Sequence, residues 1–119
     1  MYDQGLLREV RSAGEWEKIF ERGVRQGAGL DVHHLIERWF AERVFGLDPD
    51  DVPAVVLDRT FHQQEVTARL FSRDFLPTNK THTPQEIWNA YQRLYRDKLG
   101  HPEWLEAIWP YFQRLEVQR

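Results

Sequence analysis

Three histidines have the chemistry and the spacing from which this chain can build a reactive centre: His33, His34 and His62. His33 and His34 are adjacent in a short β-branched segment, and neighbouring side chains on a strand point to opposite faces. At a strand end, where the backbone bends, one of the two is able to bind a metal ion while the other approaches a substrate. A neutral histidine in that second position is suited to act as a general base near neutral pH.

His62 falls near the start of a predicted helix that follows a second predicted strand, and Glu65 lies one helical turn further along. We expect His33 and His62 to converge, with Glu65 as a third candidate ligand. Two or three ligands without a thiolate leave positions for water and substrate, as a catalytic ion requires. The alternative is that the histidine pair is incidental and that His62 and Glu65 belong to a solvated helix face.

The composition restricts the other chemistries that are available. The 119 residues include no cysteine, which excludes a disulfide framework, a thiol nucleophile and a thiolate metal site. The formal net charge of −3 argues against a generic polybasic binder of nucleic acid or membranes. The cations are 13 Arg and only 3 Lys; arginine is a bidentate partner for phosphate, although GC-rich coding produces the same bias. No transmembrane run or secretory signal is visible.

The elements that must position these residues form a helix-rich α+β pattern, in a chain whose length suits a single domain over 1–119. Two short strands are predicted, at 30–36 and 53–57. Capping signals predict helix starts at Ser12, Thr60 and Thr83. Trp39, Phe40 and Val44 give helical periodicity to the second helix, and Pro110 is expected to kink the last helix or end it early. The predicted helices cover 12–24, 37–45, 60–76, 83–99 and 102–112.

Three stretches, taken in order, carry a resemblance to a known family: Leu30-Asp-Val-His-His-Leu-Ile-Glu-Arg-Trp-Phe40, Gly46-Leu-Asp-Pro-Asp-Asp-Val-Pro-Ala-Val-Val-Leu57, and Phe61-His62-Gln63. This set resembles the C-terminal nuclease toxin domains of bacterial polymorphic toxins, which belong to the HNH or His-Me finger endonuclease superfamily. The stretch from Thr83 to Gln92 is similar to a helix that follows the core of these toxins. The resemblance covers about residues 28–112 and implies a small ββα-metal finger core surrounded by helices.

The resemblance implies a role for each of the three histidines. His33 looks like a metal ligand, His62 like the helix-borne ligand, and His34 like the general base that activates water. One divalent ion (Mg, Mn, Zn or Ni) is implied, which bridges the scissile phosphate in the family.

Two departures from the family pattern bear on the metal ligands. No Asn between Glu37 and Phe61 matches the middle residue of the HNH pattern. The second helix histidine of some zinc-binding members would fall four residues after His62, where this chain has Val66. Glu65 is therefore our candidate for the third metal ligand.

Other polar residues are assigned supporting roles. Glu37 and Arg38 are close to the histidine pair in sequence and are expected to orient it. Arg69, two helical turns after His62, is the candidate phosphate-binding residue, with solvation as its alternative. His82 and His101 are expected to be structural or exposed. The Trp and Tyr stripes of the last two helices are expected to form core.

The expected function is a metal-dependent endonuclease, acting as a toxin effector domain on DNA or RNA, with DNA favoured. The resemblance further implies a cognate immunity protein, delivery as part of a larger protein, and action in the cytoplasm of a target bacterium. Two rival hypotheses remain. One is a helical interaction module, such as an adaptor or immunity-like protein, with incidental histidines. The other is a non-nuclease metal hydrolase with the same ligands.

Overall fold

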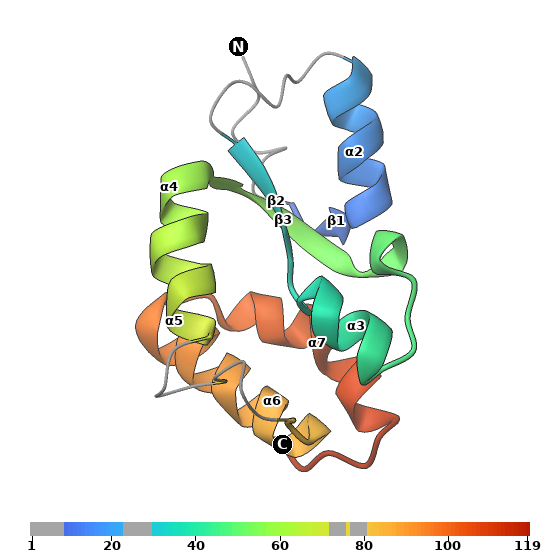
Figure 1. Cartoon of the computed structure of the whole chain (residues 1–119), viewed down its shortest axis with the longest axis vertical. Coiled ribbons are helices and arrows are strands. Elements are labelled where there is room, and N and C mark those ends of the chain that lie inside the picture. Colours follow the sequence, from blue (N-terminus) through green and yellow to red (C-terminus); the bar gives the residue numbers. More distant parts are fainter. Residues whose placement is uncertain (1–8, 23–29, 72–75, 77–80) are drawn as a thin grey trace. The chain divides into compact units, whose positions relative to one another are not determined.

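The computed structural model describes residues 9–22, 30–71, 76 and 81–119, with the backbone alone at 20–22. Within these ranges the fold is helix-rich α+β, which confirms the predicted class (Figure 1). The chain divides into two compact units, the first ending at His62 and the second beginning at Gln63. None of the helices described has both the length and the apolar character needed to cross a membrane.

The first unit is built on a three-stranded antiparallel sheet with the order β1-β3-β2. Its strands are β1 (Arg11–Ser12), β2 (Leu30–His34) and β3 (Pro53–Asp58). The pairing of β2 with β3 sets Val32 opposite Val56 and His33 opposite Val55. Because side chains alternate along a strand, Asp31 and His33 share one face of β2.

Helix α2 (Ala13–Arg22) packs on this sheet through its apolar stripe. Ala13 and Trp16 are fully buried with Ala54 and Val56, and the indole Nε1 of Trp16 donates a hydrogen bond to the carbonyl of Ala54 over 3.0 Å. The Ser12 hydroxyl accepts from the backbone N–H of Glu15, which confirms the predicted cap of this helix. The predicted glycine stop after this helix lies outside the described residues.

The segment after β2 forms a short helix, α3 (Arg38–Arg43), with Glu37 as its N-cap. Gly46 then adopts a φ of +64°, a conformation that residues with a Cβ rarely adopt, and this ends the predicted helical segment. The turn predicted at 48–51 is the short 3₁₀ helix η2 (Pro49–Asp51), which leads into β3.

The next helical stretch consists of α4 (Arg59–Phe61), the π-helical segment η3 (His62–Thr67) and α5 (Ala68–Leu70). The unit boundary falls inside it, after His62. The rest of the second unit contains α6 (Pro84–Tyr91), the π-helical segment η4 (Gln92–Lys98) and α7 (Pro102–Gln113). Trp88, Tyr91, Tyr95, Trp104 and Phe112 are buried with their rings in contact, which confirms the predicted aromatic core.

Four expectations from the sequence are wrong. The helix before the unit boundary begins at Arg59 rather than Thr60, because the Asp58 carboxylate accepts from the backbone N–H of Phe61. That helix ends at Leu70 rather than near position 76. A third strand, β1, is present that is too short to show a strand pattern in the sequence. The last helix does not end early at Pro110 but continues to Gln113, with Phe112 buried in the core.

Candidate functional site

His33 and His62 lie against each other in the first unit, as the sequence predicted. The Nδ1 atom of His33 is 3.1 Å from the Nε2 atom of His62, and the ring centroids are 4.8 Å apart. The antiparallel register of β2 with β3 and the helix start directly after β3 bring the two rings together. His33 is completely buried, while the His62 side chain is 17% exposed, so solvent reaches the pair from the His62 side.

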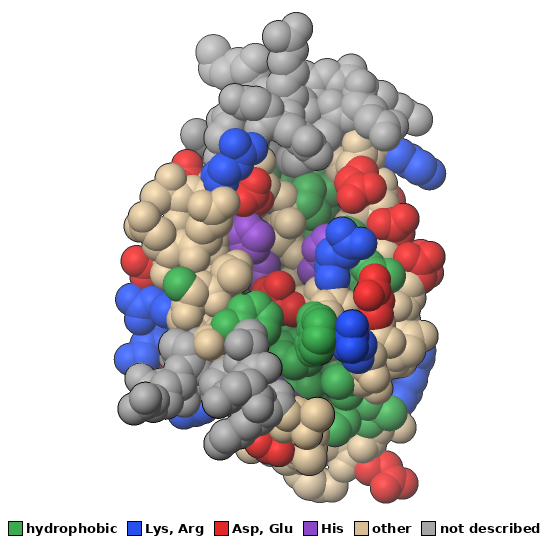
Figure 2. Space-filling view, viewed as in Figure 1, with side chains coloured by type: hydrophobic (Ala, Val, Ile, Leu, Met, Phe, Trp, Pro, Cys, Tyr) green, Lys and Arg blue, Asp and Glu red, His purple; other side chains and the backbone are tan. Residues whose placement is uncertain are grey.

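Asp31 completes this cluster, and the sequence analysis did not identify it. Its Oδ2 atom lies 3.1 Å from Nδ1 of His62, and its Oδ1 atom accepts a hydrogen bond from Nε of Arg59 over 3.1 Å. The alternation of β2 was the available signal, because Asp31 precedes His33 by two residues and therefore shares its face. On the side of the molecule that Figure 2 shows, histidine side chains reach the surface with Lys or Arg side chains beside them.

Hydrogen bonding and burial fix the protonation of the cluster. Burial acts to raise the pKa of Asp31, but the hydrogen bonds from His62 and Arg59 outweigh it and hold that pKa below its ordinary value. An ionised Asp31 accepts only, so His62 donates to it from Nδ1 and turns Nε2 toward His33. Burial, followed by the charges of His62 and His34, lowers the pKa of His33 well below its ordinary value.

Glu37 lies next to the buried histidine. Its Oε1 atom is 3.6 Å from Nδ1 of His33, and its side chain is only 16% exposed. Burial raises the pKa of this carboxyl to about 7. The Glu37 carboxyl group therefore faces the same nitrogen of His33 that faces His62, while its role in orienting the pair stays a prediction.

His34 lies on the opposite face of β2 from His33, as strand alternation requires, and is partly exposed. Burial lowers its pKa most, the charge of Arg38 lowers it further, and Asp50 opposes both. His34 is therefore neutral near neutral pH and able to accept a proton. Arg38 thus acts on His34 through its charge, and its role in orienting the pair stays a prediction.

Glu65 and Arg69 belong to the second unit, where they bind each other. The Nε and a terminal nitrogen of Arg69 lie 2.9 and 2.8 Å from Oε2 of Glu65. Glu65 as a third metal ligand and Arg69 as a phosphate contact stay predictions. Of the remaining histidines, His101 contacts Glu103 and stacks on Trp104, with ring centroids 4.2 Å apart.

The donor atoms were tested for their fit to a metal ion. Across the ranges described, no group of three or more His, Asp or Glu side chains is arranged to hold one. Two facing imidazole nitrogens 3.1 Å apart nevertheless match the ~3.3 Å between two tetrahedral ligands at ~2.05 Å from zinc. The Asp31 carboxylate on the far nitrogen of His62 is the usual support of a metal-binding histidine. The donor set thus fits an ion bound by two imidazoles, with its other ligands from water and substrate.

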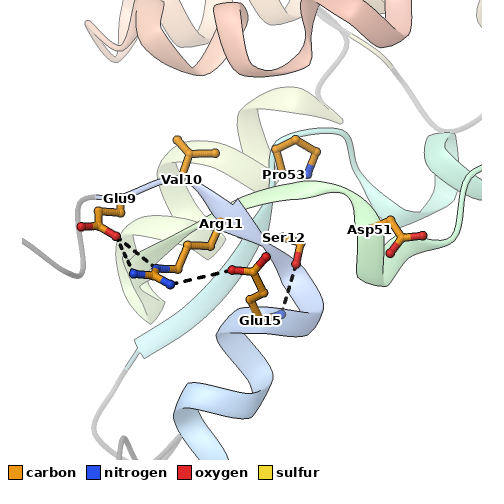
Figure 3. Close-up of a pocket in the computed structure, with 7 residues that line it drawn as sticks. All are labelled: Glu9, Val10, Arg11, Ser12, Glu15, Asp51 and Pro53. Atoms are coloured by element: carbon orange, nitrogen blue, oxygen red, sulfur yellow. Dashed lines mark hydrogen bonds and ion pairs between the residues drawn. The ribbon is translucent and has the colours of Figure 1, made fainter.

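A separate pocket of ≈ 410 Å³ adjoins β1 (Figure 3). The Arg11 guanidinium lies between the carboxylates of Glu9 and Glu15, at 2.7 and 3.8 Å. Asp51 adds a third carboxylate to the lining. This pocket contains no histidine and is acidic, so its chemistry does not suit a phosphodiester substrate.

Comparison of the chain with protein-family models, with curated proteins and with solved structures found no match.

Proposed function

We propose that this chain is a metal-dependent endonuclease that hydrolyses phosphodiester bonds in DNA or RNA. The observation that carries the proposal is the facing pair of ring nitrogens, Nδ1 of His33 and Nε2 of His62, 3.1 Å apart. Two imidazoles, one from a strand and one from a helix start, form a donor set with open positions for substrate. His34 ends the same strand on its other face, close enough to His62 for the charge of that ring to affect its pKa, and supplies a neutral imidazole for proton transfer.

Each residue of the cluster has a separate role in holding the ion. His33 and His62 supply nitrogen donors, and Asp31 fixes the tautomer of His62 through its hydrogen bond to Nδ1. Glu37, whose Oε1 is 3.6 Å from Nδ1 of His33, lies beside that donor nitrogen and would place a carboxyl group next to a bound cation. A bound divalent ion supplies Lewis-acid stabilisation of the charge that develops on the phosphate and the leaving oxygen.

His34 acts as the general base in this proposal. Its lowered pKa keeps the ring neutral near neutral pH, so it is able to take a proton from an attacking water. Arg38 and Asp50 act on His34 with opposite charges, Arg38 favouring the neutral ring and Asp50 the protonated one that forms after the transfer. Such a base contributes about 10²–10⁴-fold to the rate.

The biological setting that we propose follows from the resemblance of Leu30–Phe40, Gly46–Leu57 and His62 to polymorphic toxin nucleases. The chain would act as a toxin effector domain in the cytoplasm of a target bacterium, delivered within a larger protein and neutralised by a cognate immunity protein. DNA is the favoured substrate.

The test is direct cleavage of nucleic acid. Purified chain is incubated with plasmid DNA and with total RNA, each with Mg²⁺, Mn²⁺, Zn²⁺ or Ni²⁺ and with a chelator. We expect cleavage that needs one of these ions and that falls about 10²–10⁴-fold in His34→Ala. His33→Ala and His62→Ala should also lose binding of the active ion by calorimetry.

His101→Gln is the matched control, because it removes a histidine of the second unit and should cleave like the parent. Unchanged cleavage by His34→Ala would overturn the general-base assignment. Unchanged ion binding by His33→Ala and His62→Ala would overturn the ligand assignment. If no ion supports cleavage of either nucleic acid, the endonuclease proposal fails, and this result favours the interaction-module hypothesis.

A further inference from the structure

Trp39 is the most exposed large apolar side chain among the described residues, at 55%. Trp16, Trp88 and Trp104, by contrast, are buried at 4% exposure or less. The neighbouring Phe40 is the residue of α3 that packs its ring into the core, with 3% exposure. Packing of the fold therefore does not account for the indole of Trp39.

Arg43 stacks on this exposed indole. Its guanidinium carbon lies 3.7 Å from the ring centroid of Trp39, one helical turn away on α3. A cation at this distance over a tryptophan face is held by the ring electrons and by its planar contact. The stack fixes the orientation of the ring and adds a positive charge to it. We call Trp39 and Arg43 together the Trp39–Arg43 platform.

The positive charge around the platform is not cancelled by ion pairs. Within the described part of the chain, neither Arg38 nor Arg43 takes part in one. Glu42 is the only carboxylate of α3, whose sequence is RWFAER, so the helix carries a net charge of +2 − 1 = +1. The helix is thus locally basic in a chain of net charge −3, and Arg38 acts electrostatically on His34.

We propose that the Trp39–Arg43 platform binds a nucleobase, with one base of a single strand stacked on Trp39 and the adjoining phosphates contacted by Arg43 and Arg38. This rests on the proposed nuclease function and adds the recognition of substrate bases beside the reactive centre. Exposed aromatic rings next to cations are the means by which proteins bind single strands without sequence preference.

The size and charge of the platform favour this occupant over a protein. A stable protein interface buries about 800 Å² on each partner, and α3 exposes a single large apolar side chain. One indole matches one base in size and planarity. Two cations outside ion pairs complement the phosphates on either side of that base.

The experiment measures binding without cleavage, in a His34→Ala background with chelator. A labelled oligothymidylate strand and an abasic strand of the same length are titrated by fluorescence anisotropy. Trp39→Leu should weaken binding of the base-bearing strand about 5- to 100-fold and leave the abasic strand unchanged. Trp39→Phe should keep most of the affinity. Arg43→Gln should weaken binding of both strands.

Leu115→Ala is the control, since it removes another exposed apolar side chain, of 42% exposure, and should bind both strands like the parent. The proposal is overturned if the parent binds neither strand. It is also overturned if Trp39→Leu binds both strands as tightly as the parent, or if its affinity for both strands falls by the same factor. A change of oligomeric state in Trp39→Leu with strand binding intact also overturns it and identifies a protein-binding surface.

Cleavage measurements distinguish a failure of this inference from a failure of the proposed function. Trp39→Leu with an intact His34 should lose more of its cleavage of single-stranded DNA than of its hydrolysis of bis(p-nitrophenyl) phosphate, which has no base. If the wild-type chain cleaves nothing while Trp39→Leu still loses strand binding, the nuclease proposal fails and the platform stands. If the wild-type chain cleaves nucleic acid, and Trp39→Leu cleaves and binds single strands as well as the wild-type chain, the platform is wrong and the nuclease proposal stands.

Discussion

The Oδ2 atom of Asp31 lies 3.1 Å from Nδ1 of His62, and this contact determines which nitrogen of His62 faces His33. Asp31 is two residues before His33 on the same strand face, so one strand supplies both a proposed ligand and the carboxylate that orients its partner. Arg59 donates to the other oxygen of Asp31 and holds the carboxylate in place. The orientation of His62 is thus set by residues of the first unit.

Replacing Asp31 with Asn should weaken metal binding about 10- to 100-fold, because a neutral amide supports the ligand nitrogen of His62 less well. Calorimetry with the ion that supports cleavage measures this loss. Asp31→Glu should recover part of the affinity. Asp97→Asn is the control, since it makes the same change at an exposed carboxylate of the second unit. An affinity in Asp31→Asn equal to that of the parent would show that this contact is only structural.

The sequence predicted the features that depend on local patterns. The Ser12 and Thr83 caps, the strand at Pro53 and the meeting of His33 with His62 all follow from signals within a few residues or from alternation and chain order. Asp31 was missed for a different reason. Helical spacing points forward from His62 to Glu65, whereas the carboxylate that contacts His62 lies on the strand.

Burial was harder to predict, because it depends on how whole elements pack. The pattern of α3 grouped Trp39 with Phe40 as apolar, yet neighbouring helix positions point about 100° apart, and only Phe40 faces the core. No local signal distinguishes the two. The burial of Glu37, which raises its pKa to about 7, likewise arises from tertiary packing around His33.

Trp16 should be a main source of stability in the first unit. It is completely buried against the sheet, and its indole donates to the Ala54 carbonyl over 3.0 Å. Trp16→Phe removes that hydrogen bond and part of the packing, so the free energy of unfolding should fall by about 1–3 kcal/mol in urea titrations. Trp39→Phe is the matched control at an exposed site, and its free energy of unfolding should differ from that of the parent by no more than about 0.5 kcal/mol. Equal losses in both variants would contradict this assignment.

The cap of α6 should matter in the second unit. The Thr83 hydroxyl accepts from the backbone N–H of Glu86 over 3.1 Å, and the Glu86 carboxylate accepts from the backbone N–H of Thr83 over 3.2 Å. Thr83→Ala should lower the free energy of unfolding by about 1 kcal/mol, measured by urea titration. Thr81→Ala, two residues earlier at an exposed position outside any helix, should leave it unchanged. A loss as large in Thr81→Ala would show that the cap is not the cause.

Glu86 should also make the stability depend on pH. Hydrogen bonds from the backbone and side chain of Thr83 lower the pKa of Glu86 below its ordinary value of 4.5. Because the folded pKa lies below the unfolded one, the charged carboxylate stabilises the fold above pH 4.5, and this contribution is lost as the pH falls through the folded pKa.

Glu86→Gln tests this dependence, because glutamine keeps an acceptor for the Thr83 N–H but has no charge to lose. The difference in free energy of unfolding between the parent and Glu86→Gln should be largest near pH 7 and should shrink below pH 4.5. Other carboxylates, including Asp31 and Asp97, also have lowered pKa values, so both proteins lose stability in acid and only their difference isolates Glu86. A difference that stays constant across this range would mean that Glu86 titrates equally in the folded and unfolded chain.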